Sequence, residues 1–183
     1  MQRRQPGIWI YYLTAVIVFA LDYASKKIIA ATLELEEQIP VIGNFFLITS
    51  IRNRGAAFGI LQEQRAFFIL ITIAVVAAIV WYLQRSYKQD RRLLMFALAM
   101  VLGGAVGNFL DRAIYGEVVD FLQLNFGSYT FPIFNLADCG IVCGVALIIL
   151  DSLLSSGKEK KDNDEHGEQP GEPSGEQEQP TAR

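Results

Sequence analysis

The chain has 183 residues, of which 52% are hydrophobic, and its formal net charge is −3 at pH 7. Residues 158–183 alone contain eight acidic and four basic residues, so the rest of the chain is close to neutral. The only histidine, His166, lies in this polar tail, which excludes most Ser–His, Cys–His and His–metal sites.

Several stretches carry few or no charges over about 20 residues, the length of helix that crosses the hydrocarbon core of a bilayer. The first, residues 8–28, follows Arg3 and Arg4 and carries Asp22 near its far end. Its basic start and apolar core are also typical of a signal peptide. Because no small-x-small cleavage site follows the apolar core, we expect this segment to stay in the protein as a membrane span.

The second and third spans, residues 66–84 and 93–110, contain no charged residue. The linker between them, RSYKQDRR, carries four basic residues and one acidic residue. The positive-inside rule therefore places this linker and the N-terminus in the cytoplasm. The fourth span begins at Pro132 or Asn135 and ends at Leu154, shortly before three lysines, so the C-terminus is expected inside as well.

Residues 29–65 and 111–131 must then lie outside. The first segment contains QIPVIGNFFLITSIRNRGAAFGI, which is rich in β-branched and aromatic residues and is broken by proline and glycine. The second contains EVVDFLQLNFGSYTF, with a turn expected near Gly127 and Ser128. Both segments predict short strands of a small extracytoplasmic β-sheet.

The predicted fold is an all-α polytopic membrane protein with four transmembrane helices and that small sheet. Residues 1–156 form the membrane core, with spans at about 8–28, 66–84, 93–110 and 135–154. The acidic tail, residues 157–183, is rich in Glu, Gln, Pro, Gly and Ser, and we expect it to be cytoplasmic and disordered.

Polar residues collect at the outer ends of the spans. An ionisable group there costs free energy, so its presence indicates a partner or a function. Spacings of three and four residues place members of each cluster on one helix face. For any single residue, helix packing or contact with lipid headgroups is an equally good explanation. The whole set in one layer favours a functional site, and its members are Asp22, Asn108, Asp111, Arg112, Asn135 and Asp138.

Asp120 lies in the apolar frame Val-Val-Asp-Phe of the second outer segment, where an unpaired carboxylate is expensive. If Asp120 and Asp138 meet, the two carboxyl groups share one proton, and the charge of one raises the apparent pKa of the other. One member of such a pair activates water while the other protonates the carbonyl oxygen or the leaving amine. Because Asp138 lies in the first turns of a helix, whose positive end favours a charge, we expect Asp120 to hold the proton.

The lysines near the outer boundary have a simpler interpretation. Lys26 and Lys27 are expected to meet lipid headgroups. A Ser25–Lys26 catalytic dyad is disfavoured, because adjacent residues of a helix do not face each other.

Two other classes of function remain open at this point. In a small transporter or channel, the aspartates would line an ion path, but the polar groups stop at the outer layer. A membrane scaffold that binds a partner through the outer sheet would leave Asp120 and Asp138 without a role.

Five blocks of the chain, in order, resemble the lipoprotein signal peptidase (signal peptidase II) family. They are LDYASK at 21–26, RNRGAAFG at 52–59, GGAVGNFLDR at 103–112, VVDF at 118–121 and FNLAD at 134–138. The resemblance implies a globomycin-sensitive aspartic endopeptidase of the bacterial inner membrane, which cuts lipid-modified prolipoproteins immediately before the lipidated cysteine.

The resemblance also implies residue roles. It makes Asp120 and Asp138 catalytic, at the outer face of the membrane. It assigns substrate-binding or supporting roles to other polar residues, and Asp111 is expected to be structural, paired with Arg112 or a neighbouring helix. Gly55 and Gly59 would allow close backbone approach beneath the outer sheet. We expect function as a monomer, with prolipoproteins and membrane lipid as partners, and no nucleic acid, metal or cofactor. The supporting set is Asp22, Asn53, Gly55, Asn108, Asp111, Arg112 and Asn135.

Overall fold

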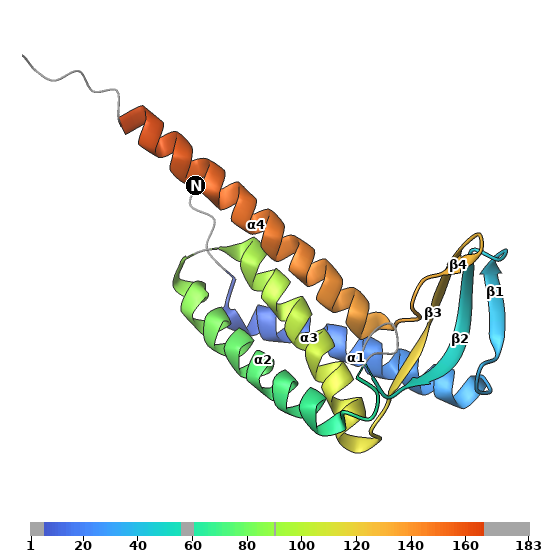
Figure 1. The fold of residues 1–183 in the computed structure, drawn as a ribbon. Helices are drawn as coiled ribbons and strands as arrows, with labels where there is room; N and C mark the ends of the chain where they lie inside the picture. Colours follow the sequence, from blue (N-terminus) through green and yellow to red (C-terminus); the bar gives the residue numbers. More distant parts are fainter. Residues whose placement is uncertain (1–5, 56–60, 90, 167–183) are drawn as a thin grey trace, which may run out of the picture.

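The computed structural model describes residues 6–55, 61–89 and 91–166, and Figure 1 shows its ribbon. Four helices form a bundle, and each is long and apolar enough to cross a membrane. A short 3₁₀ turn, η2 (Tyr87–Gln89), connects the second helix to the third. The prediction of four spans is therefore confirmed, and the helices are α1 (Ile8–Thr32), α2 (Arg65–Ser86), α3 (Arg92–Ile114) and α4 (Leu136–His166).

Each helix extends beyond its predicted span at one or both ends. α1 continues to Thr32, because no proline or glycine interrupts the sequence after the last apolar residues of the span. α4 continues past Ser156 to His166, so its backbone is helical within the first part of the predicted tail. Residues 167–183 of that tail lie outside the described residues.

A four-stranded antiparallel sheet lies at one end of the bundle, as predicted (Figure 1). The strands follow one another in chain order, and the predicted turn at Gly127 and Ser128 joins the last two. Gly127 adopts a φ of 65°, a conformation that favours glycine. The strands are β1 (Gln38–Ile42), β2 (Phe46–Asn53), β3 (Val118–Phe126) and β4 (Tyr129–Thr130).

α3 is the central helix, because it packs against α1, α2 and α4. Its buried residues include Leu94, Met95, Leu98 and Leu102, which form the hydrophobic core with side chains of α1 and α2. The outer faces of the other helices carry large exposed apolar side chains, such as Trp81 on α2. An exposed apolar surface of this extent is expected where the helices contact lipid.

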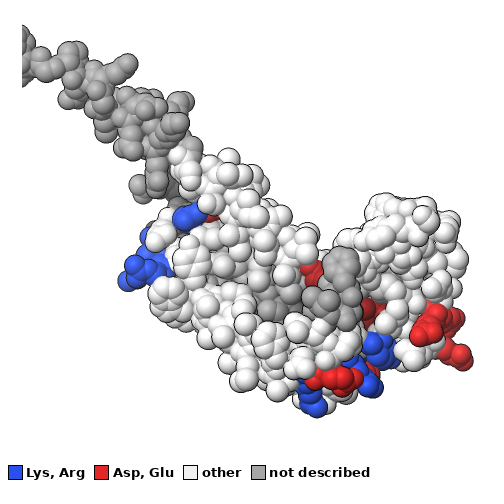
Figure 2. Space-filling view, in the orientation of Figure 1, with Lys and Arg blue, Asp and Glu red and all other residues white. Residues whose placement is uncertain are grey.

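The two ends of the bundle differ. The sheet lies at one end, and the start of α1, the α2–α3 connection and the C-terminal part of α4 lie at the other (Figure 1). Charged side chains gather at these ends, while the middle of the molecule in the view of Figure 2 is almost free of them. Arg91 and Asp151 form an ion pair at the end opposite the sheet, between α3 and α4.

Glycines of α3 allow its neighbours to approach closely. A β carbon at Gly103 would collide with the backbone oxygen of Ala15 on α1, and one at Gly104 with the backbone oxygen of Ala137 on α4. Small residues at a helix interface permit this backbone contact. Gly104 therefore sets the distance between α3 and the first turn of α4.

We expect Gly104→Ala to destabilise the protein by about 1–3 kcal/mol, because the added methyl group forces α3 and α4 apart. Gly140→Ala is the matched control on the facing helix. Its β carbon would lie 2.9 Å from Cγ1 of Val18 and 3.4 Å from the oxygen of Met100, so a side chain can yield instead of a backbone. Thermal unfolding in detergent should show a larger fall in Tm for Gly104→Ala, and equal shifts would contradict this interpretation.

Candidate active site

The first turn of α4 is held by reciprocal hydrogen bonds. The side-chain oxygen of Asn135 accepts from the backbone N–H of Asp138 at 3.1 Å, and the Asp138 carboxylate accepts from the Asn135 N–H at 3.2 Å. This is the capping-box arrangement, with Asn and Asp in place of the usual pair. Another N–H of this turn, that of Ala137, donates to the carboxylate of Asp22 on α1 at 2.8 Å. Asp138 is thereby fixed at the positive end of the helix dipole.

Asp120 reaches the same place from the sheet. A bulge in β2 interrupts its register with β3 between Ile48 and Ile51, and Ile51 pairs with Asp120. Such bulges re-aim side chains. On the other edge of β3, Phe134 pairs with Leu122, which brings Asn135 close to Asp120. The Asn135 amide nitrogen donates to Asp120 Oδ1 at 2.6 Å.

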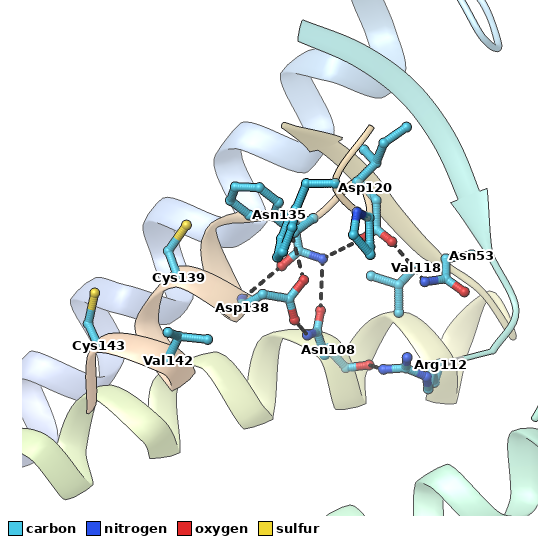
Figure 3. Close-up of a pocket in the computed structure, with 14 residues that line it drawn as sticks. Asn53, Asn108, Arg112, Val118, Asp120, Asn135, Asp138, Cys139, Val142 and Cys143 are labelled. Carbon is cyan, nitrogen blue, oxygen red and sulfur yellow. Dashed lines mark hydrogen bonds between the residues drawn. The ribbon is translucent and has the colours of Figure 1, made fainter. Parts of the chain in front are cut away.

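Asn108 of α3 completes a chain of amides between the two aspartates (Figure 3). Its nitrogen donates to Asp138 Oδ1 at 2.8 Å, and its oxygen accepts from the Asn135 nitrogen at 3.2 Å. The two carboxyl groups are thus linked in the order Asp120, Asn135, Asn108, Asp138. Residues from α3, α4 and β3 that are far apart in sequence meet at this point.

Both aspartates line a cavity of about 510 Å³ at the sheet end of the bundle. One wall of the cavity is polar. The other wall is apolar and continues along α4 through Cys139, Val142 and Cys143. The polar side chains are Asn53, Asn108, Arg112, Asp120, Asn135 and Asp138, and the remaining lining residues are Val118 and residues 131–134.

Three more of the predicted site residues, Asn53, Gly55 and Arg112, form hydrogen bonds that connect the end of β2 to α3. Asn53 donates to Asp120 Oδ2 at 2.9 Å and accepts from the Gly55 N–H at 2.9 Å. Arg112 donates to the Gly55 oxygen at 3.0 Å, and its guanidinium lies 4.7 Å from the centre of the Phe68 ring. Gly55 therefore ties the end of β2 to α3, whereas Gly59 lies outside the described residues.

Asp22 and Asp111 lie beside the cavity and form a buried ion cluster with Lys26. The Lys26 ammonium is 2.8 Å from Oδ2 of each aspartate. The predicted headgroup contact of Lys26 is wrong, because its exposed fraction is only 3%. Asp111 is expected to pair with Arg112 or with a neighbouring helix, and in the structure it pairs with Lys26 on the neighbouring helix α1. The i,i+4 spacing of Asp22 and Lys26 was the sequence signal that indicates a pair within the helix.

The environments of the two carboxyl groups differ. Asp120 is 4% exposed, and burial raises its pKa to about 6. The hydrogen bond from Asn53 opposes this rise, and the charge of Asp138 adds to it. Asp138 is partly exposed and accepts hydrogen bonds from Asn108 and from its own helix terminus. Burial therefore favours the protonated form of Asp120.

Residues 14–154 match the family model described as Signal peptidase (SPase) II. The lipoprotein signal peptidase of Bacillus subtilis (strain 168) is 48% identical over 153 residues, covering 84% of this chain and 99% of that protein. The lipoprotein signal peptidase of Bacillus pumilus (strain SAFR-032) is 48% identical over 151 residues, covering 82% of this chain and 97% of that protein.

Two solved structures, described as bacterial membrane enzymes determined by the in meso method at 2.3 and 1.9 Å resolution, share 39% identity with the chain. The first has a TM-score of 0.77 and covers 87% of this chain and 96% of its own; the second has a TM-score of 0.73 and covers 84% and 98%. The matches span the four helices and the sheet, and the chain therefore belongs to the signal peptidase II family of signal-peptide-cleaving membrane proteases.

Proposed function

We propose that the chain is an aspartic endopeptidase that removes signal peptides from diacylglyceryl-modified prolipoproteins by cleaving before the lipidated cysteine. Asp120 and Asp138 are the catalytic pair that activates water. The observation that carries this proposal is the arrangement of two carboxyl groups on one cavity, linked through Asn135 and Asn108 and set in unequal environments.

The unequal environments supply one acid and one base. Asp138, at the helix N-terminus, is the carboxylate that accepts a proton from water. Asp120, buried in the sheet, is the carboxylic acid, because its raised pKa keeps the proton bound to a higher pH. A pair in which both members carry the same charge could perform only one of these two tasks.

The reaction then proceeds in two balanced steps. Water loses a proton to Asp138, its oxygen attacks the scissile carbonyl carbon, and Asp120 gives its proton to the carbonyl oxygen. When the resulting gem-diol collapses, the C–N bond breaks, Asp138 passes its proton to the leaving amine, and Asp120 recovers a proton from a gem-diol hydroxyl. Both aspartates return to their initial states, and no group outside the pair is consumed.

The shape of the cavity suits a substrate that is anchored in lipid. Its apolar wall runs along α4 from Cys139 to Cys143, and Val142 in this wall is 66% exposed. A diacylglyceryl chain can therefore stay in the bilayer while the peptide bond above it reaches Asp120 and Asp138. Water reaches the pair from the sheet end of the bundle.

The orientation follows from the positive-inside rule. The basic N-terminus and the basic α2–α3 linker lie in the cytoplasm, so the sheet and the catalytic pair face the outer side of the bacterial inner membrane. One chain supplies every residue of the pair and of its amide link, which supports function as a monomer.

A transport pathway fits the structure less well. Four of the buried charged side chains among the described residues, Asp22, Lys26, Asp111 and Asp120, lie at the sheet end, and Asp151 lies at the other end in a pair with Arg91. An ion path needs polar groups between the two ends. The central assay is cleavage of a lipidated prolipoprotein by the purified chain, with inhibition by globomycin as a further test.

We expect Asp120→Asn and Asp138→Asn each to reduce cleavage by about 10³-fold or more, because each removes one half of the acid–base pair. Asp151→Asn is the matched control, since it changes a second aspartate of α4 at the far end of the bundle, and it should retain cleavage. Circular dichroism and size-exclusion profiles in detergent check that all three variants fold. Retained activity in a folded Asp120→Asn or Asp138→Asn protein would remove that residue from the pair.

We expect the Asp120 carboxyl to titrate near pH 6 in the folded protein, against a pKa of about 3.9 for an unperturbed aspartate. Since the folded state binds this proton more tightly than the unfolded chain, the contribution of Asp120 to stability falls as pH rises from about 4 to about 6. Carboxyl-resolved NMR with assignments from the two Asn variants measures both groups. A proton that resides mainly on Asp138 would contradict the assignment of acid and base.

A further inference from the structure

Lys26 is a buried cation whose partners are all polar. Its ammonium lies 2.8 Å from Asp22 on the same helix, 2.8 Å from Asp111 on α3 and 2.9 Å from the side-chain oxygen of Asn108. Three partners match the three protons that an ammonium group can donate. Two of these contacts are ion pairs, one within α1 and one between α1 and α3. The third is a hydrogen bond to the neutral amide of Asn108.

The amide of Asn108 has two possible orientations, which exchange its oxygen and its nitrogen. In the observed orientation the oxygen accepts from Lys26 and Asn135, and the nitrogen donates to Asp138. In the flipped orientation the amide nitrogen would face the ammonium and the donor of Asn135, so the oxygen's two hydrogen bonds would be lost. A cation accepts no hydrogen bond, so Lys26 excludes the flipped orientation in every protonation state of Asp138.

This exclusion matters at the moment when Asp138 takes a proton from water. Once protonated, the Asp138 carboxyl group can itself donate a hydrogen bond. An Asn108 amide without the Lys26 contact would then flip, so that its oxygen accepts this hydrogen bond and holds the proton on Asp138. With Lys26 present, Asn108 remains a donor toward Asp138. A donor stabilises the charged carboxylate and favours release of the proton to the leaving amine.

We propose that Lys26 is a positioning residue for the reaction: through Asn108 it keeps a hydrogen-bond donor on Asp138 and so keeps Asp138 the charged member of the pair. This inference rests on the proposed function. The same ammonium also ties α1 to α3 through its ion pair with Asp111, and the experiment must therefore separate the two roles.

Other charges around these groups enter the design of the experiment. They lie on several elements, and among the described residues Lys26 is the charged side chain that donates to the amide oxygen of Asn108. The neighbouring groups are Asp22 on α1, Asp111 and Arg112 on α3, Cys139 on α4, and Lys27, Arg52 and Glu117, which line a second cavity of about 180 Å³ together with Lys26.

The experiment measures kcat and KM for a lipidated prolipoprotein from about pH 4 to pH 9, with purified Lys26→Met and Asp111→Asn proteins beside the wild type. The acidic limb of kcat/KM reports the group that must be deprotonated, which is Asp138. We expect Lys26→Met to move this limb to higher pH by roughly 0.5–1 unit, and so to lower kcat/KM by roughly 3–10-fold at pH values on the limb, with little change in KM.

Asp111→Asn is the matched control. It removes one ion pair between α1 and α3 but leaves Lys26 and its bond to Asn108, and it also removes a negative charge near the pair. Its acidic limb should therefore stay in place or move downward, although its Tm falls as well. An unchanged limb in Lys26→Met, or an equal upward shift in Asp111→Asn, would overturn the inference.

Lys26→Met leaves two buried carboxylates without their cation, and this protein could fail to fold. In that case the comparison is between Asp111→Asn and the double variant Lys26→Met/Asp111→Asn, which differ only at Lys26. The same upward shift is expected between them, and its absence would overturn the inference. Retained cleavage in Asp120→Asn or Asp138→Asn would instead reject the proposed function, whatever the Lys26 variants show.

Discussion

The first backbone N–H groups of α4 have no backbone partners within the helix, and side chains of α1 and of the residue before α4 accept hydrogen bonds from two of them. Asp22 of α1 accepts from Ala137, and Asn135 and Asp138 accept from each other's backbone. Because the Asn135 amide also donates to Asp120 on β3, one helical turn connects the bundle to the sheet. A buried amide left without partners costs about 1–3 kcal/mol. Because the Asn135 amide takes part in several of these contacts, the loss of one partner weakens the others. Both carboxyl groups are therefore hydrogen-bonded to this single terminus.

Much of the fold is predictable from the sequence, because membrane spans depend on length and apolar composition alone. Residues 66–84 and 93–110 carry no charge and lie within α2 and α3. The sheet is predictable because β-branched and aromatic residues alternate with turn residues such as Gly127. The layer of polar residues at one end of the bundle follows from the topology once the spans are known.

The geometry of the site depends on contacts that spacing does not encode. Asn108, Asp111 and Arg112 share a helix face by their spacing, yet Asn108 and Arg112 line the large cavity while Asp111 turns toward Lys26. The bulge in β2 and the pairing of Phe134 with β3 decide where Asp120 and Asn135 lie, and both are tertiary features. The sequence predicts the wrong environment for Lys26, because its carboxylate partner on α3, Asp111, is far away in sequence.

The ion pair between Asp22 and Lys26 has a consequence for the biogenesis of the protein. α1 leaves the ribosome long before α3, so its two buried charges must first meet the translocon without Asp111 or Asn108. Their i,i+4 spacing lets them neutralise each other within one helical turn, which lowers the cost of passing an isolated α1 into lipid. When α3 arrives, Asp111 joins a pair that already exists and gives α1 and α3 a specific polar contact within the bundle.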